Sequence, residues 1–190
     1  MESVSLLITL LCAEFLGRVW LEIREVRLTM SRGGVFALLR VIPLVNDIVP
    51  LPENRREPSE TEFVKKHEEA HKVMHHDILR NIAKLILALI AIWFLAAQLI
   101  RVGMPLWQGI LWLHVVAIPF RVLFHLYCWN QEYEADAYAH KELGKQKTKV
   151  AMRELAECEI PYTHFFALMY REHPTAALRS KRLLNKVIKK

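Results

Sequence analysis

The chain has 190 residues, of which 53% are hydrophobic and 24% charged, and its formal net charge at pH 7 is +6. This length suits one domain, or a small domain joined to membrane helices. A basic balance fits nucleic acid or a membrane surface, but no DNA-reading motif or aromatic-interleaved basic patch occurs, so we expect no nucleic-acid partner. Three widely spaced cysteines, an odd number, argue against a disulfide framework or a thiolate zinc site.

Residues 1–23 form the first apolar block. It is interrupted by Glu14, Arg18 and Glu22, which recur every four residues and therefore share one face of a helix. A cleaved signal peptide is the alternative, but the start of the chain carries Glu2 instead of positive charge, and no small-x-small cleavage site follows. We predict a retained membrane helix with a polar stripe.

Residues 24–58 form a juxtamembrane segment. Its β-branched and apolar runs, between residues 33 and 51, predict one or two short strands, and residues 41–51 are the candidate for binding substrate. A capping box at Ser59, with Glu62 three residues later, predicts a helix over residues 59–82. No glycine or proline separates it from the next apolar block, so the helix can continue into the bilayer.

Residues 83–129 contain two further apolar blocks. The first, residues 83–100, has the length that a helix needs to cross the hydrocarbon core. A turn with glycine and proline follows, and the second block, residues 106–129, carries aromatic side chains near both ends. We predict a transmembrane hairpin whose second helix continues in the cytoplasm to Gly144.

Basic residues flank this hairpin on one side. The segments 24–82 and 130–190 are rich in Lys and Arg, whereas the hairpin turn has Arg101 alone, so the positive-inside rule places both segments in the cytoplasm. Residues 130–190 should hold further helices at 148–159 and 175–188. The predicted fold is mainly α: a multi-pass integral membrane bundle of about three transmembrane helices with a small cytoplasmic helical domain.

The predicted helix over residues 59–82 carries a His-Glu-x-x-His motif. His67 and His71 are four residues apart, so both imidazoles can face one metal ion. Glu68 lies beside the first ligand and can take a proton from a zinc-bound water, whose pKa zinc lowers to roughly 7. A catalytic zinc site needs a third protein ligand and an open position. A charged helix surface without metal is the alternative reading of this segment.

Glu132 is the best candidate for the third ligand, because the hairpin returns the chain to the side and depth of the histidine helix. Asp136 follows four residues later on the same face, and could accept a hydrogen bond from a ligand histidine. Glu134 points elsewhere on the helix and is a weaker candidate. His75 could bind the metal, but a fourth protein ligand would close the open position, so we expect a supporting or surface role.

Ionisable side chains form two polar stripes on the predicted membrane helices. One consists of His114, Arg121 and His125 in line with the proposed ligand on the second hairpin helix, and the other is the stripe of the first helix. Ionisable residues at membrane depth rarely face lipid, so these stripes either face each other or line a wet cavity, or they hold the bundle together by ion pairing. Glu14 and Glu22 are both candidate partners of Arg121.

Three motifs in order resemble the HtpX-like integral-membrane zinc peptidases, which include the CAAX prenyl protease. They are His-Glu-Glu-Ala-His at 67–71, Glu-Tyr-Glu-Ala-Asp at 132–136 and His-Pro, four residues and Arg at 173–179. The chain resembles a minimal version, since such proteins have two membrane helices before the first motif and we find one. The resemblance implies a zincin-like catalytic domain facing the cytoplasm, with His173 or Arg179 near the reaction centre, where either could stabilise an oxyanion.

We therefore predict a membrane-bound zinc endopeptidase that holds one Zn²⁺ per chain and hydrolyses membrane or membrane-proximal polypeptides. Glu68 is the predicted general base, His67, His71 and Glu132 are the predicted ligands, and Asp136 is their support. A catalytically inactive zinc-binding membrane scaffold or sensor is the alternative. The pattern does not identify the substrate or the oligomeric state.

Overall fold

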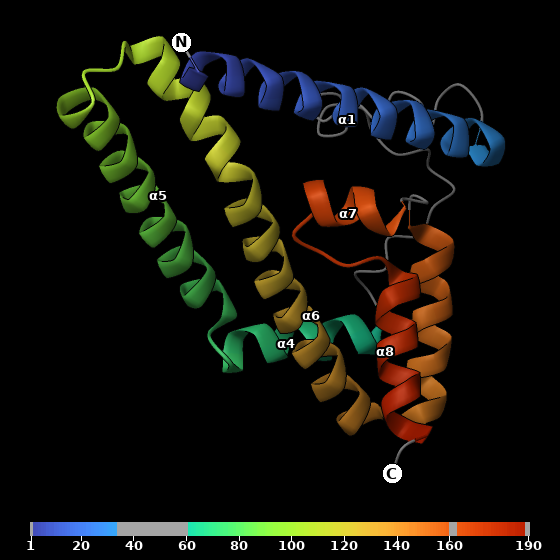
Figure 1. The fold of residues 1–190 in the computed structure, drawn as a ribbon. Coiled ribbons are helices and arrows are strands. Elements are labelled where there is room, and N and C mark those ends of the chain that lie inside the picture. The colour runs from blue at the N-terminus through green and yellow to red at the C-terminus, as the bar shows by residue number, and fades with distance from the viewer. Residues whose placement is uncertain (1, 34–60, 160–162, 189–190) are drawn as a thin grey trace.

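The computed structural model describes residues 2–33, 61–159 and 163–188, and every regular element in these ranges is an α-helix (Figure 1). The prediction of a mainly α-helical chain is confirmed for this part. The short strands predicted up to residue 51 fall on residues outside the described ranges. The first helix, α1 (Glu2–Gly33), extends ten residues beyond the apolar block that predicted it.

Three helices are long and apolar enough to cross a membrane, judged by length and composition. Their apolar spans are Val4–Leu21 in α1, His76–Arg101 and Leu106–Glu157. The second span is α5 (His76–Arg101), and the third lies within α6 (Leu106–Cys158). Figure 1 shows α5 and the beginning of α6 as an antiparallel pair, the arrangement that the sequence predicted for a hairpin.

The metal-motif helix, α4 (Glu62–Val73), begins and ends differently from the prediction. Its N-cap is Thr61, whose Oγ1 accepts a hydrogen bond from the Val64 amide at 3.3 Å. The helix therefore starts after Thr61 and not after Ser59. It also does not continue into the next apolar helix, because His75 has a positive φ of 56° and turns the chain before α5 begins.

Helix α6 has two arms that meet at Gly144. This residue has φ 77° and ψ 171°, a conformation that glycine adopts without the steric cost that a Cβ would bring. The predicted helix end at Gly144 is thus confirmed, and the helix predicted from residue 148 is the second arm of α6. The hydroxyl of Thr148 donates to the Gly144 carbonyl at 2.8 Å and supports the turn.

Two short helices complete the chain. The helix predicted at 175–188 is α8 (Ala176–Ile188), and α7 (His164–Tyr170) was not predicted. A hydrophobic core joins α4, both arms of α6 and α8. It is built on Phe63, Ala139, Met152 and Leu183. Because Gly144 folds the second arm back, α4 is packed between the two arms and α8, which holds the metal motif in place.

The two polar stripes meet at one point. Glu14 of α1 lies 2.8 Å from His114 Nε2 on α6 and also accepts a hydrogen bond from Arg18. Arg121 is exposed and pairs with no side chain that the structure describes, so Glu14 is not its partner; the side chain of Glu22 lies outside the described part. His125 is buried and donates from Nδ1 to the Leu168 carbonyl at 2.7 Å, which ties α6 to α7.

Candidate metal centre

Three buried donor groups from two helices meet where α4 crosses the first arm of α6. His67 and His71 lie one turn apart on α4, with their Nε2 atoms 3.1 Å apart. Glu132 is 1% exposed, and its carboxylate oxygens lie 3.3 Å from His67 Nε2 and 3.4 Å from His71 Nε2. The structure thus brings together the three residues that the sequence predicted as ligands, and they form a group able to hold a metal ion.

The separations among these donor atoms suit zinc. Tetrahedral coordination with bonds of about 2.0–2.1 Å places neighbouring ligand atoms about 3.3 Å apart. The two Nε2 atoms are 3.1 Å apart, and each lies near a different oxygen of Glu132: Oε2 is 3.3 Å from His67 Nε2 and Oε1 is 3.4 Å from His71 Nε2, all close to this value. Two imidazoles and one carboxylate are also a donor set that catalytic zinc sites use, with a fourth position left for water or substrate. The residues therefore fit a zinc ion.

Asp136 and Arg179 orient His67 from the side of its ring that faces away from the metal position. The Asp136 carboxylate lies 3.0 Å from His67 Nδ1, on the far side of the ring from the other ligands. A proton on Nδ1 that is donated to Asp136 leaves Nε2 with a free lone pair toward the metal position. Arg179 donates from Nε and Nη2 to the two oxygens of Asp136, at 2.9 and 2.6 Å, in a fork that fixes this carboxylate.

Glu132 is held through both carboxylate oxygens. Arg80, in the first turns of α5, donates to Oε1 at 2.7 Å, and His173 Nδ1 lies 3.1 Å from Oε2. Arg80 also donates to the side-chain oxygen of Gln131 at 2.6 Å. Helix α5, a candidate membrane span, thus contacts the predicted third ligand directly, and the chain segment before α8 contacts the same carboxylate through its other oxygen.

The second ligand histidine is supported by a further histidine. The Nδ1 atoms of His76 and His71 are 2.9 Å apart, and His76 is 2% exposed. His75, for which we expected a supporting or surface role and not a ligand role, is exposed and occupies the turn between α4 and α5. The left-handed turn at His75 rotates the next residue toward the metal centre, so His76 takes the supporting place.

The pKa values of the two ligand histidines move in opposite directions. Burial lowers the pKa of His71 to about 4, against the attraction of Glu132, so its imidazole is neutral near pH 7 and free to bind a metal. Burial also acts to lower the pKa of His67, but its hydrogen bonds with Asp136 and Glu132 outweigh burial and raise it. A cation at the metal position would take the place of the proton that these carboxylates favour on His67.

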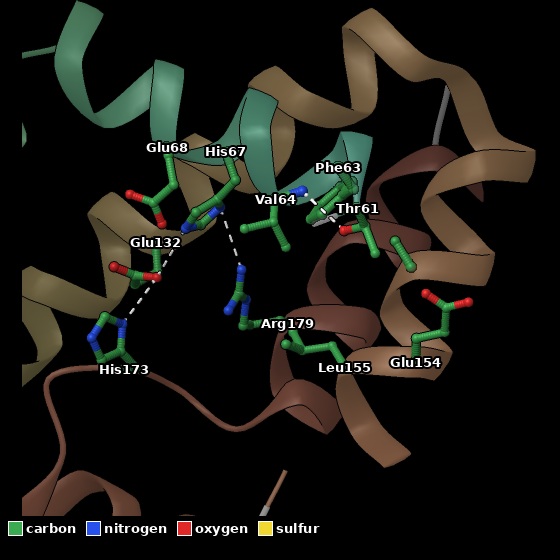
Figure 2. A pocket seen from close by; sticks show the side chains of 11 residues that line it. Thr61, Phe63, Val64, His67, Glu68, Glu132, Glu154, Leu155, His173 and Arg179 are labelled. Carbon is green, nitrogen blue, oxygen red and sulfur yellow. Dashed lines mark hydrogen bonds and ion pairs between the residues drawn. The ribbon is translucent and has the colours of Figure 1, made fainter. Parts of the chain in front are cut away.

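A cavity of about 180 Å³ opens beside the ligands (Figure 2). Glu68 lines it, is exposed, and makes no hydrogen bond or ion pair with a described residue. Figure 2 shows its carboxylate pointing toward the side on which Glu132 and His173 lie. His173 is 61% exposed at the same cavity, and Arg179 also lines it. All of the predicted site residues are therefore at the cavity or within one hydrogen bond of it.

Sequence reasoning missed two of the residues that contact ligands, Arg80 and His76. The position of Arg80 in the sequence could have identified it, because a basic residue at the edge of an apolar span usually has an acidic or polar partner. His76 had a weaker signal, since an uninterrupted helix through residue 82 would have placed it away from the site. The break at His75 decides its direction.

Comparison with known proteins gives one finding. The model of peptidase family M48 matches residues 36–187, that is, 152 of the 190 residues, and the matched range includes all three motifs. Searches of curated proteins and of solved structures found no match.

Proposed function

The chain belongs to peptidase family M48, and from this premise we propose that it is a membrane-bound zinc endopeptidase of the HtpX-like type that cleaves membrane or membrane-proximal polypeptides. Membership of the family implies zinc metallopeptidase activity. The observation that supports the proposal most is the placement of Glu68 on a cavity beside the donor atoms of His67, His71 and Glu132. A site that merely stored a metal would not need an acid in that place.

The chemistry follows from the positions of these groups. His67, His71 and Glu132 would hold one zinc ion, which when bound polarises the scissile carbonyl and acidifies water. Glu68 takes the proton of the attacking water and passes it to the leaving amine, which makes it general base and then general acid. Asp136 keeps the His67 ring in the tautomer that leaves Nε2 free.

The groups from the C-terminal part have separate proposed roles. His173 lies with Nδ1 against Glu132, and we assign its Nε2 to the oxyanion that forms on the substrate carbonyl. Arg179 uses Nε and Nη2 on Asp136, so we assign it to holding that carboxylate, while its positive charge at the cavity wall favours the same oxyanion.

Large apolar side chains on the outside of α5 support the membrane part of the proposal. Leu85, Ile92 and Trp93 are 60%, 65% and 66% exposed, and such a continuous apolar surface marks contact with lipid or protein. The basic segments on both sides of the hairpin support a metal centre on the cytoplasmic side. A reporter fused after Lys190 should be active in the cytoplasm and silent outside, and the reverse result would contradict this orientation.

Glu68→Gln is the variant that tests the proposal. Glutamine keeps the size of the side chain but cannot accept the proton, so hydrolysis should fall by about 10²–10⁴-fold. Glu68 contacts no ligand atom, so the zinc content should stay at one per chain. Purified wild type and variant are compared by metal analysis and by cleavage of an unfolded membrane protein, with Glu157→Gln, an exposed acid outside the cavity lining, as the matched control.

The outcomes separate the two candidate functions. Activity that survives Glu68→Gln would show that Glu68 is not the base. A wild type that binds zinc but cleaves no member of a broad panel of unfolded membrane and soluble proteins would favour the alternative, a zinc-binding scaffold or sensor. Removal of zinc with a chelator should abolish cleavage, and added zinc should restore it.

A further inference from the structure

The cavity beside the metal ligands has two chemically different walls. The polar wall consists of the site residues described above, including Glu68 and His173. The apolar wall is formed by Phe63 and Val64 of α4 and by Ala151 and Leu155 of α6. Figure 2 shows Leu155 and Glu154 on the side opposite Glu132 and His173, so a group in the cavity touches the apolar wall while its neighbour reaches the metal centre.

The second arm of α6 builds this wall because of its register. Ala151 and Leu155 are four residues apart and share one face, and Glu154 lies beside them. The turn at Gly144 brings that face against α4, where Met152 packs with Phe63 in the core. The wall is therefore built on packed helices and not on a loop.

Size and charge define which side chain fits. Cavities of about 150 Å³ lined by Leu, Ile and Phe hold a benzene molecule, so about 180 Å³ accommodates the side chain of Leu, Met or Phe. Two exposed acids, Glu68 and Glu154, line the same cavity, whereas Glu132 is paired with Arg80 and the guanidinium of Arg179 is paired with Asp136. These carboxylates would repel an acidic side chain of the substrate, and a small side chain would not reach the apolar wall.

We propose that this cavity is the specificity pocket of the enzyme and that it selects a medium or large apolar residue next to the scissile bond, with Ala151 and Leu155 as the specificity-determining residues. The inference rests on the proposed function, since a pocket selects a substrate residue only if the chain cleaves peptides. Discrimination between a well-fitting apolar side chain and alanine should amount to about 10–100-fold in kcat/KM, the range found for apolar pockets.

Two variants change the pocket in opposite directions. Ala151→Leu fills it, so cleavage next to Phe should fall about 10–100-fold while cleavage next to Ala is retained. Leu155→Ala enlarges it, so the preference should move toward Phe and Trp. Ala156→Leu is the matched control, because Ala156 is exposed on the same arm, is not part of the cavity lining, and should leave the preference unchanged.

The experiment maps every cut in an unfolded membrane protein by mass spectrometry for the wild type, the three variants and the inactive Glu68→Gln. A binding measurement accompanies it: in the Glu68→Gln background, fluorescent peptides with Leu should bind at least tenfold more tightly than the same peptides with Asp. Cuts next to Leu, Met and Phe that shift in both variants support the pocket.

The experiment distinguishes a failure of the pocket proposal from a failure of the proposed peptidase function. Cuts with no apolar preference, or a preference that both variants leave unchanged, overturn the pocket while the peptidase stands. Absence of Glu68-dependent cleavage overturns the proposed function, and with it the pocket. If the Ala151→Leu variant does not fold, the Leu155→Ala variant and the comparison of peptide binding still test the pocket.

Discussion

Replacing Asp136 by asparagine separates the two tasks that this carboxylate has in the structure. Asp136 is 1% exposed, lies 3.0 Å from His67 Nδ1, and accepts two hydrogen bonds from Arg179. Asparagine keeps the shape and one acceptor oxygen but removes the negative charge. Arg179, whose side chain is 11% exposed, is then left with its positive charge largely buried and uncompensated.

The Asp136→Asn substitution should change both the folding stability and the zinc affinity. Breaking a buried ion pair from one side costs about 3–5 kcal/mol of folding stability, because the remaining charge has no partner. Losing the carboxylate that orients a ligand histidine lowers metal affinity by about 10–100-fold. Asp136→Asn should therefore unfold more easily and also bind zinc more weakly, and the two effects must be measured separately.

A double variant, Asp136→Asn with Arg179→Met, separates them. Removing both buried charges is often neutral for folding, so the midpoint of denaturant unfolding in detergent should return toward the wild type. Zinc affinity, measured by competition with a chelator, should stay about 10–100-fold weaker because His67 still lacks its carboxylate. Zinc affinity within twofold of the wild type in the double variant would refute the idea that Asp136 orients His67.

Three further predictions concern stability, each read from unfolding of the detergent-solubilised protein. Arg80→Gln should lower the free energy of unfolding by about 3 kcal/mol, because it leaves the buried Glu132 without its guanidinium partner. Arg121→Gln, on the exposed side of α6, is the control and should change stability by less than about 0.5 kcal/mol. Equal effects of the two variants would contradict the contact between Arg80 and Glu132. The pKa of His71 is lowered to about 4, so between pH 6.5 and 4 the unfolded chain binds a proton that the folded chain does not. The free energy of unfolding of the zinc-free protein should therefore fall by about 2 kcal/mol as pH falls through this window, after allowance for screening by water. His71→Asn should flatten that dependence, and an unchanged slope would show that another group causes it. Phe63→Ala should cost about 3–5 kcal/mol, because the ring is 4% exposed in the core between α4, α6 and α8, and Phe165→Ala, at a side chain 49% exposed, should cost far less.

Local patterns were enough to identify the elements that carry the site. The four-residue spacing of His67 and His71 defines a shared helical face whatever the rest of the chain does. The apolar spans between residues 83 and 129 likewise predict their own helices, because length and composition are local properties. The glycine at 144 predicted a helix end, and its positive φ confirms it.

Precise helix boundaries depended on contacts that no local pattern encodes. Thr61 is the N-cap of α4 although Ser59 fitted a capping box with Glu62, and the side chain of Glu62 pairs with Lys147 of the second arm of α6 instead. The break at His75 has no glycine or proline to announce it. The local sequence is compatible with a continuous helix, and in the structure the break separates α4, which packs against α6, from α5.

By itself, the sequence determined the chemistry: two histidines and an acid on one helix, a carboxylate pair on another, and apolar spans between them. Only the tertiary structure decided which side chains complete the centre. Arg80 reaches Glu132 across 52 residues, and Arg179 reaches Asp136 across 43, because α5 and α8 pack against the two arms of α6. The physical reason is that a helix pattern fixes which residues share a face, whereas the neighbour that meets this face is set by how the helices cross.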